Sequence, residues 1–167
     1  LGDHGHHSYR ESFPLGSVRL LEKFRPGDPP SPRELEACRG WLTAFLNQNI
    51  GDQMEDQIAD PARGPVTLVG TGGTTTILAR MKKQLTHFDR DAIDGTHLLL
   101  DQLTHYTNDL WSRPLLDRKT VPGLPANRAD VIIMGVVIYE AVLRHFRLPE
   151  LYVSTRGLRF GALLDMP

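Results

Sequence analysis

Hydrophobic positions along this chain follow two different spacings. Apolar residues recur every three or four positions in stretches that therefore predict helices, at 16–24, 32–50, 74–85, 103–118, 126–146 and 158–165. Short apolar or β-branched runs between turn residues predict strands at 7–15, 66–69, 96–100 and 150–154. Strands that alternate with helices are typical of an α/β domain.

Local signals sharpen two of these helices. Ser31 at the N-cap, Pro32 at the first helical position and Glu34 three residues after the cap form a capping box, which predicts where the second helix begins. Pro114 predicts a break in the helix at 103–118. The segment 126–146 is rich in β-branched residues, which favours a strand, but its length favours one deeply buried helix. Its apolar run is shorter than the roughly 20 residues of a membrane span.

A glycine-rich turn follows the strand predicted at 66–69. Gly70, Gly72 and Gly73 precede a helix that begins near Thr74, with Thr71 between the glycines. Glycines allow backbone N–H groups to approach a ligand, and a helix N-terminus favours an anion, so this turn predicts a phosphate-binding loop. It lacks the lysine of a P-loop and the third glycine of a dinucleotide fingerprint. The alternative is a tight turn that binds nothing.

Composition and charge restrict the remaining choices. The 167 residues fit a single domain, 1–167, and the net charge of -1 indicates neither DNA binding nor a membrane surface. Cys38 is the only cysteine, so an internal disulfide is excluded, and its position on the apolar face of a helix predicts that it lies in the core. The absence of disulfides and of a recognisable signal peptide predicts a cytoplasmic protein. A start at Leu1 without methionine leads us to expect a fragment of a longer protein.

Four segments together resemble one family. They are SFPLGSVRLLE at 12–22, VGTGGT at 69–74, PGLPANRADVI at 122–132 with a glycine at 135, and VSTRGLR at 153–159. In this order and spacing they resemble the exopolyphosphatase/guanosine pentaphosphatase (Ppx/GppA) phosphatases over nearly the whole chain. The resemblance implies an actin-like ATPase or ribonuclease H-like fold built of two domains, with an active site in the cleft between them. This chain resembles the second domain only.

The resemblance also implies an activity. Members of this family remove terminal phosphates from inorganic polyphosphate or guanosine pentaphosphate with Mg²⁺ and an activated water. Their catalytic carboxylates, metal ligands and principal phosphate loop correspond to sequence outside this chain, so the isolated chain is expected to be inactive and to need the missing first domain. The apolar surface on which that domain would dock leads us to expect self-association of the isolated chain, as a homodimer. The alternative is a non-hydrolytic actin-like domain that binds a nucleotide or alarmone, or serves as a scaffold.

Within the chain, the resemblance points to the loop from Gly70 to Thr74 and to Arg128 as the residues that face phosphate or nucleotide. A guanidinium bonds two phosphate oxygens at once, although a surface ion pair is an equal alternative for Arg128. Asp130 is expected to complement a helix N-terminus. Phe160 stands where the family usually has a glutamate, so Arg159 is not expected to be a site residue.

Two further candidates have simpler explanations. His4, His6 and His7 could suggest a metal site, but their position at a Gly-Asp-His-Gly turn favours an exposed hairpin. Glu140 could serve as a general base, but its place near the end of the helix at 126–146 favours a solvated helix face. The chain itself is therefore expected to contribute no metal ligand and no catalytic residue.

Overall fold

A small central sheet organises the chain in the computed structural model, which describes residues 1–3, 6–50, 52–60 and 64–164. The sheet has the order β3-β5-β4, formed by β3 (Leu68–Thr71), β4 (His97–Leu99) and β5 (Glu150–Ser154). β5 runs parallel to β3 and antiparallel to β4. A separate two-stranded hairpin pairs β1 (Gly2–Asp3) with β2 (His6–His7).

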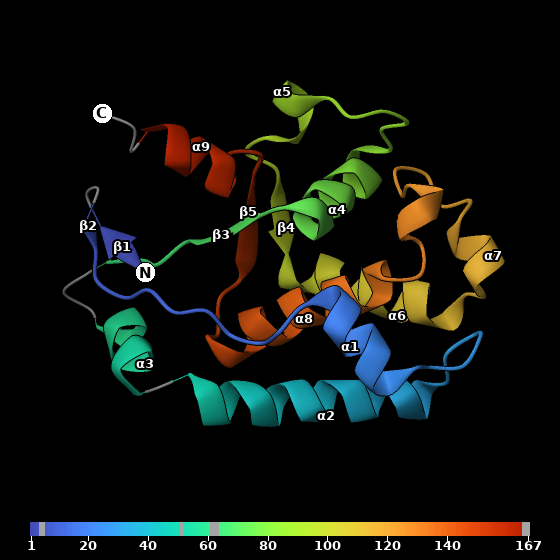
Figure 1. The fold of residues 1–167 in the computed structure, drawn as a ribbon, viewed down its shortest axis with the longest axis horizontal. Coiled ribbons are helices and arrows are strands. Elements are labelled where there is room, and N and C mark those ends of the chain that lie inside the picture. Colours follow the sequence, from blue (N-terminus) through green and yellow to red (C-terminus); the bar gives the residue numbers. More distant parts are fainter. Residues whose placement is uncertain (4–5, 51, 61–63, 165–167) are drawn as a thin grey trace.

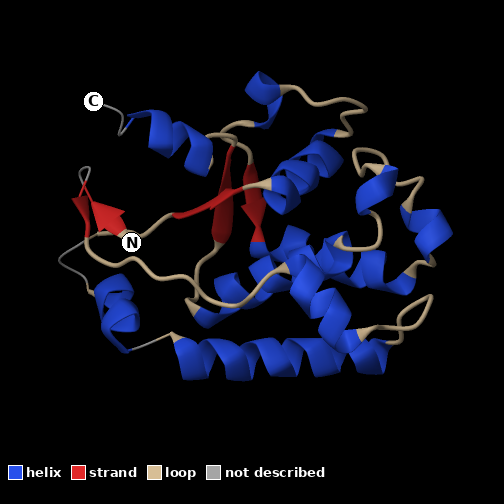
Figure 2. Ribbon diagram, in the orientation of Figure 1, coloured by secondary structure: helices blue, strands red, loops and turns tan. Residues whose placement is uncertain are grey.

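Helices surround the sheet (Figures 1 and 2). They are α1 (Ser17–Phe24), α2 (Pro32–Asn49), α3 (Asp52–Ala59), α4 (Gly73–Lys83), α5 (Arg90–Ile93), α6 (Leu100–Ser112), α7 (Leu115–Arg118), α8 (Ile132–His145) and α9 (Leu158–Leu164), with a 3₁₀ turn η2 (Ala126–Arg128) before α8. The mixture confirms the α/β class. The strand predicted at 150–154 matches β5, and the helix predicted at 103–118 breaks at Pro114, which caps α7.

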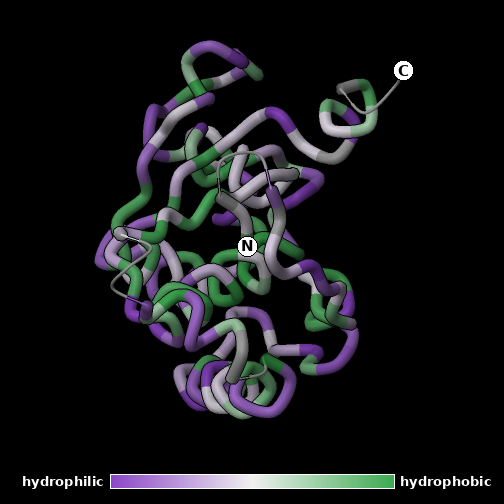
Figure 3. Tube along the Cα trace, turned by 90° about the vertical axis from the view of Figure 1, so that its left-hand side faces the viewer, coloured by the Kyte–Doolittle hydropathy of each residue, from purple (hydrophilic) through white to green (hydrophobic). Residues whose placement is uncertain are grey.

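Helix α8 lies at the centre of the packing. It contacts α1, α2, α4 and α6, so nearly every face of its first half is covered by another helix. Six consecutive residues, from Ile132 to Val137, are buried. This coverage explains why a β-branched segment forms a helix here: tertiary burial on all sides overrides its intrinsic preference for a strand. Hydrophobic and hydrophilic segments alternate along the tube in Figure 3, as is typical of helices that bury one face.

The start of α2 is the capping box that the sequence predicts. The Ser31 hydroxyl accepts the backbone N–H of Glu34 at 3.3 Å, and the Glu34 carboxylate accepts the backbone N–H of Ser31 at 2.7 Å. Cys38 follows on the inner face of the helix with no exposed area, and burial raises the pKa of its thiol to about 12. The prediction that Cys38 belongs to the core is confirmed.

The strand predicted at 7–15 is wrong over most of its length. Only His6 and His7 form β2, and the ladder to Leu1 ends at Tyr9. From residue 10 to 16 the chain is irregular, because no neighbouring strand of the described chain lies beside it to pair with its backbone. His4 lies outside the described residues.

Two glycines allow α4 to pack closely against its neighbours. A Cβ at Gly135 of α8 would lie 2.5 Å from the Thr74 hydroxyl oxygen of α4, closer than non-bonded atoms approach. A Cβ at Gly123, whose φ is +85°, would lie 2.5 Å from the Arg80 carbonyl at the other end of α4. Two glycines from later in the chain therefore allow close packing at both ends of α4, Gly135 against the Thr74 side chain and Gly123 against the Arg80 backbone.

The prediction that Glu140 lies on a solvated helix face is wrong. Its side chain is 1% exposed rather than solvated. Arg39 of α2 donates to both carboxylate oxygens at 3.1 Å, Arg144 donates to one of them at 3.0 Å, and the Thr104 hydroxyl of α6 donates at 3.3 Å. Burying a carboxylate is costly unless it is paired, and these partners provide that pairing while joining three helices.

Phe160 has a definite role despite departing from the family pattern. The Arg90 guanidinium carbon lies 4.8 Å from the centre of the Phe160 ring, so a cation–π contact links α9 to α5. Arg159 is exposed. The aromatic ring thus connects α9 to the rest of the domain by a different interaction from the carboxylate pair that a glutamate would offer.

We expect Arg39→Ala to lower the free energy of unfolding by about 2 kcal/mol. Removing one partner of a buried ion pair typically costs about 3–5 kcal/mol, and the remaining contacts of Glu140 with Arg144 and Thr104 reduce that cost. Urea denaturation measures the change. Arg33→Ala, an exposed arginine of the same helix, is the matched control and should change stability by less than about 0.5 kcal/mol. Equal effects of the two variants would contradict a structural role for the Glu140 ion pairs.

We expect Gly135→Ala to destabilise the domain by about 1–2 kcal/mol. Alanine favours a helix over glycine by up to about 1 kcal/mol, but the overpacking against Thr74 costs about 1–3 kcal/mol and outweighs that gain. Gly40→Ala in α2 is the matched control, because a Cβ there meets no atom within 4 Å. Thermal unfolding should show the control to be more stable than the parent chain. A stabilising Gly135→Ala would exclude tight contact between α8 and α4.

Candidate functional site

The glycine loop joins β3 to α4 as the sequence predicts. β3 ends at Thr71, Gly72 is the N-cap of α4, and α4 begins at Gly73. Gly72 has a φ of +101°, a conformation that side-chain-bearing residues rarely adopt. The chain therefore reverses from strand to helix within one residue, and the first N–H groups of α4 point away from the helix body.

A small cavity lies directly against this loop. Its volume is about 140 Å³, and it is lined by Ser17, Gly73, Thr74, Ile77, Arg128, Val131 and Ile132. These residues come from α1, from α4 and from the segment that leads into α8. The packing of α8 on α4 thus brings together three of the predicted site residues. These are Gly73 and Thr74, which are adjacent, and Arg128, which lies 55 positions after Gly73 in sequence.

Two helix N-termini meet at the cavity. α4 begins at Gly73 after the N-cap Gly72, and α1 begins at Ser17 after the N-cap Gly16. A glycine cap has no side chain to accept the first N–H groups of its helix, so these groups stay available as donors. Both helix dipoles present their positive ends to the same small volume. Such an arrangement favours an anion.

Arg128 adds a full positive charge. Its side chain is exposed, and its Nη2 lies 3.9 Å from the position that a Cβ on Gly73 would take. Among the described residues, no carboxylate pairs with its guanidinium. The surface ion pair considered as an alternative from the sequence is therefore absent from this part of the chain, and the cavity lining contains no acidic side chain to compete with a bound anion.

The remaining predicted residues occupy different positions. Gly70 is buried, and a Cβ there would lie 2.6 Å from a Thr75 methyl carbon and 2.7 Å from a Leu151 methyl carbon, so packing explains its glycine. Thr71 is exposed at the end of β3. Asp130 accepts the backbone N–H of Val131 at 2.8 Å, immediately before α8.

Ser17 is a site residue that sequence reasoning missed as an individual position. It lies within the segment 12–22 that carries the family resemblance, and its hydroxyl group belongs to the first turn of α1. The available signal was a Gly-Ser pair at the start of an amphipathic helix. Since α1 packs mainly on α8, a helix far away in sequence, the sequence alone could not place Ser17 beside Thr74.

The lining does not suit a metal ion. It offers backbone N–H groups, two hydroxyl groups and a guanidinium, whereas Mg²⁺ requires oxygen ligands such as carboxylates. Among the described residues, no group of three histidine, cysteine, aspartate or glutamate side chains lies close enough to hold a metal. No helix within the described ranges is long and apolar enough to cross a bilayer.

Several characterised proteins are similar to this chain. Exopolyphosphatase 1 of Mycobacterium bovis is 28% identical over 153 residues, which cover 92% of this chain and 42% of that protein. Exopolyphosphatase 2 of Mycobacterium tuberculosis is 26% identical over 159 residues, covering 93% and 48%. The chain therefore spans about half the length of the curated relatives it matches.

Solved structures share the fold. The Ppx/GppA phosphatase of Aquifex aeolicus, in its type II variant, superimposes with a TM-score of 0.77 at 29% identity, over 93% of this chain and 49% of that one. An exopolyphosphatase from Cytophaga hutchinsonii gives a TM-score of 0.75 at 22% identity, over 99% and 51%. The actin-like, ribonuclease H-like fold expected from the sequence is confirmed. The model of the Ppx/GppA phosphatase family matches residues 1–167, and the chain belongs to that family.

Proposed function

We propose that this chain forms one wall of the active-site cleft of a phosphohydrolase that removes terminal phosphates from inorganic polyphosphate, guanosine pentaphosphate or both. One observation carries the proposal. The N-termini of α1 and α4 meet at a cavity without acidic lining, together with Arg128, which has no carboxylate partner among the described residues. Similarity to exopolyphosphatases supports the same substrate class.

The cavity size favours a phosphoryl group over a whole nucleotide. At about 140 Å³ it is smaller than the roughly 300 Å³ at which drug-sized ligand pockets begin. A single phosphate unit of a longer chain would fit, with the rest of the ligand extending outward. Inorganic polyphosphate and guanosine pentaphosphate both present such a unit, so the proposal covers both.

In this proposal each residue has a limited task. The backbone N–H groups of Gly73 and Thr74 donate to non-bridging phosphate oxygens, and the guanidinium of Arg128 binds two oxygens in a bidentate manner. The Ser17 hydroxyl, from the first turn of α1, donates to a further phosphate oxygen. Because helix packing fixes the backbone donors, they hold the phosphate without reorganising as charge builds on its oxygens during transfer.

Hydrolysis needs groups that the lining of this cavity does not offer. We propose that Mg²⁺ and the carboxylate that activates water come from the first domain, outside this chain, and that the isolated chain binds phosphate without cleaving it. Mg²⁺ would supply charge neutralisation at the transferring group. This division also makes the first domain the principal proposed partner.

Phosphate release tests the enzymatic part of the proposal. The whole protein and the 167-residue chain are each incubated with long-chain polyphosphate and with guanosine pentaphosphate, with and without Mg²⁺. We expect Mg²⁺-dependent release by the whole protein and none by the chain alone. Binding of either ligand by the whole protein without release would contradict hydrolysis and favour a sensor or scaffold domain.

We expect Arg128→Ala to weaken the binding of tripolyphosphate to this chain by about 10–100-fold, because a charge-assisted bidentate contact contributes roughly 1.5–3 kcal/mol. The affinity of Arg128→Lys should lie between those of the parent chain and Arg128→Ala, since lysine keeps the charge but lacks the planar guanidinium. Isothermal titration calorimetry at fixed ionic strength measures the affinities.

Arg33→Ala removes the same charge from the exposed surface of α2 and is the matched control for that experiment. It should leave the affinity within about twofold of the parent chain. Equal weakening by Arg33→Ala and Arg128→Ala would indicate non-specific attraction rather than a site at Arg128. Unchanged binding by Arg128→Ala would overturn the proposed phosphate contact.

A further inference from the structure

The glycine loop has a second neighbour on the side of β5. β5 runs parallel to β3, with Ser154 in register with Thr71, so the two strands end side by side (Figure 1). A Cβ on Gly157, in the turn after β5, would lie 4.0 Å from the Thr71 Cβ. α4 also contacts both strands. The turn at residues 154–157 therefore lies against the beginning of the glycine loop.

Hydrogen bonds fix the backbone of this turn. The carboxylate of Asp94, which follows α5, accepts the Thr155 backbone N–H at 2.7 Å and the Thr155 hydroxyl at 2.9 Å. The Ser154 hydroxyl accepts the Arg156 backbone N–H at 3.2 Å. The Cα of Arg156 is one peptide unit, about 3.8 Å, from that of Gly157. The Arg156 side chain therefore begins close to the glycine loop, from a backbone that is held in place.

The guanidinium of Arg156 has no partner within the fold. The side chain is exposed, and among the described residues no carboxylate forms a hydrogen bond or an ion pair with it. The pKa of the Asp94 carboxyl is lowered, first by the hydrogen bonds from Thr155 and to a smaller extent by the charge of Arg156. Asp94 thus balances part of this charge, but the guanidinium N–H groups stay available as donors.

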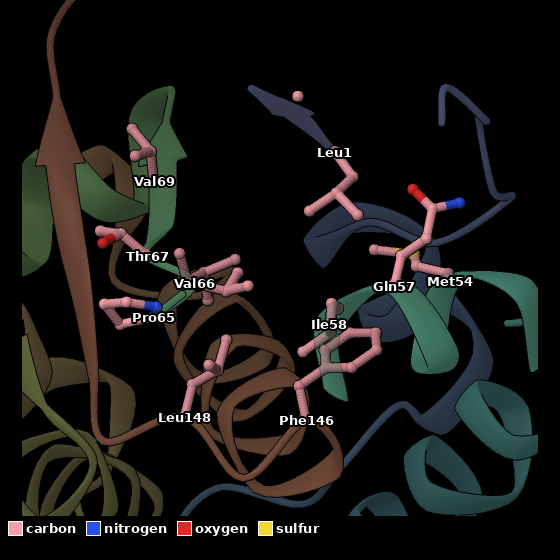
Figure 4. Close-up of a pocket in the computed structure, with 12 residues that line it drawn as sticks. Leu1, Met54, Gln57, Ile58, Pro65, Val66, Thr67, Val69, Phe146 and Leu148 are labelled. Atoms are coloured by element: carbon pink, nitrogen blue, oxygen red, sulfur yellow. The ribbon is translucent and has the colours of Figure 1, made fainter. Parts of the chain in front are cut away.

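An arginine therefore stands on each side of the glycine loop. Arg128 reaches Gly73 from the segment before α8, and Arg156 lies near Thr71 in the turn after β5. Thr71 and Gly73 are two positions apart, which spans at most about 7 Å of chain. On the opposite side of β3, the groove in Figure 4 is lined by apolar and uncharged side chains. In the described chain, the second cation beside β3 thus lies on the side of β5.

We propose that Arg156 binds the next phosphate of a ligand with linked phosphates, one unit of which occupies the cavity at Gly73 and Arg128. This inference rests on the phosphate site proposed above and adds a preference for linked phosphates over orthophosphate. At about 140 Å³ the cavity has room for one unit, so a longer ligand continues outside it, where Thr71 and Arg156 are exposed. Once one unit is held, its neighbour is present at a high effective concentration, so a surface arginine adds affinity.

Another group of arginines is a poorer place for the next phosphate. Arg39, Arg144 and Arg147 line a cavity of about 320 Å³ between α2 and the C-terminal end of α8. Arg39 and Arg144 both donate to Glu140, so much of their charge is compensated. The 14 residues of α8, about 21 Å, separate this cavity from the segment that carries Arg128. A ligand of a few linked phosphates held at Arg128 is therefore too short to reach it.

Ligands that differ in their number of linked phosphates test Arg156. Isothermal titration calorimetry without Mg²⁺ and at fixed ionic strength measures the affinity of the whole protein for tripolyphosphate. Displacement of tripolyphosphate measures the affinity for orthophosphate. The parent protein is compared with Arg128→Ala, Arg156→Ala and Arg159→Ala. Arg159 is the matched control, because it is an exposed arginine three positions after Arg156, on α9.

We expect Arg156→Ala to weaken the binding of tripolyphosphate by about 5–10-fold and to leave orthophosphate within about twofold. Arg159→Ala should leave both ligands within about twofold. Unchanged affinity for tripolyphosphate in Arg156→Ala would overturn the proposal, and so would equal losses for the two ligands or equal effects of Arg156→Ala and Arg159→Ala. Guanosine pentaphosphate also has linked phosphates and should bind more weakly to Arg156→Ala. A loss with this nucleotide alone would place the contact on the nucleoside and overturn the proposal.

The variants keep this inference separate from the cavity itself. Weaker binding by Arg128→Ala with unchanged binding by Arg156→Ala would retain the cavity and reject Arg156. The reverse pattern would reject the phosphate contact of Arg128 and retain Arg156 as a contact for linked phosphates. Arg156→Glu reverses the charge at the same exposed position and should weaken tripolyphosphate more than Arg156→Ala does. Binding by Arg156→Glu as tight as that of the parent would overturn the proposal.

Discussion

The close approach of α8 to α4 is the constraint on which the rest of this structure depends. Gly135 lies where a Cβ would meet the Thr74 hydroxyl at 2.5 Å, and this contact brings the segment before α8 beside the first turn of α4. Arg128 reaches the glycine loop only because that distance is short. The same packing buries α8 on several sides, and this burial makes a helix of a segment whose composition favours a strand.

The two ends of α8 have opposite electrostatic roles. Its 14 residues make it about 21 Å long. Near the C-terminal end, Glu140 is a buried carboxylate held by Arg39 and Arg144, so the charges there compensate one another. At the N-terminal end, Arg128 has no carboxylate partner in the described chain, and the helix termini add positive potential. Within the described residues, charge is therefore paired at the end of α8 that joins three helices and is left without a carboxylate partner at the end where we propose that phosphate binds.

Local signals in the sequence predicted much of this fold. The capping box at Ser31, the break at Pro114 and the strand at 150–154 depend on neighbouring residues and were predicted correctly. Glu140 was misjudged because its burial depends on Arg39, about 100 positions away in sequence. The strand predicted at 7–15 needs a partner strand that the described chain does not provide. Ser17 was missed for a similar reason, since only the packing of α1 on α8 brings it to the cavity.

β3 leads from an apolar groove, lined by Leu1, Ile58, Phe146 and Leu148, to the loop beside the small cavity at the start of α4. Val69 lines the groove, Gly70 is packed against Thr75 and Leu151, and Gly72 turns the chain into α4, all within four residues. Because the proposed phosphate contacts include the backbone N–H groups of Gly73 and Thr74, their placement depends on how firmly β3 is held. Among the described strands only β5 pairs with β3, so one edge of β3 is restrained by hydrogen bonds and the other is not. Contacts at the second edge therefore affect the position of the loop that lines the cavity.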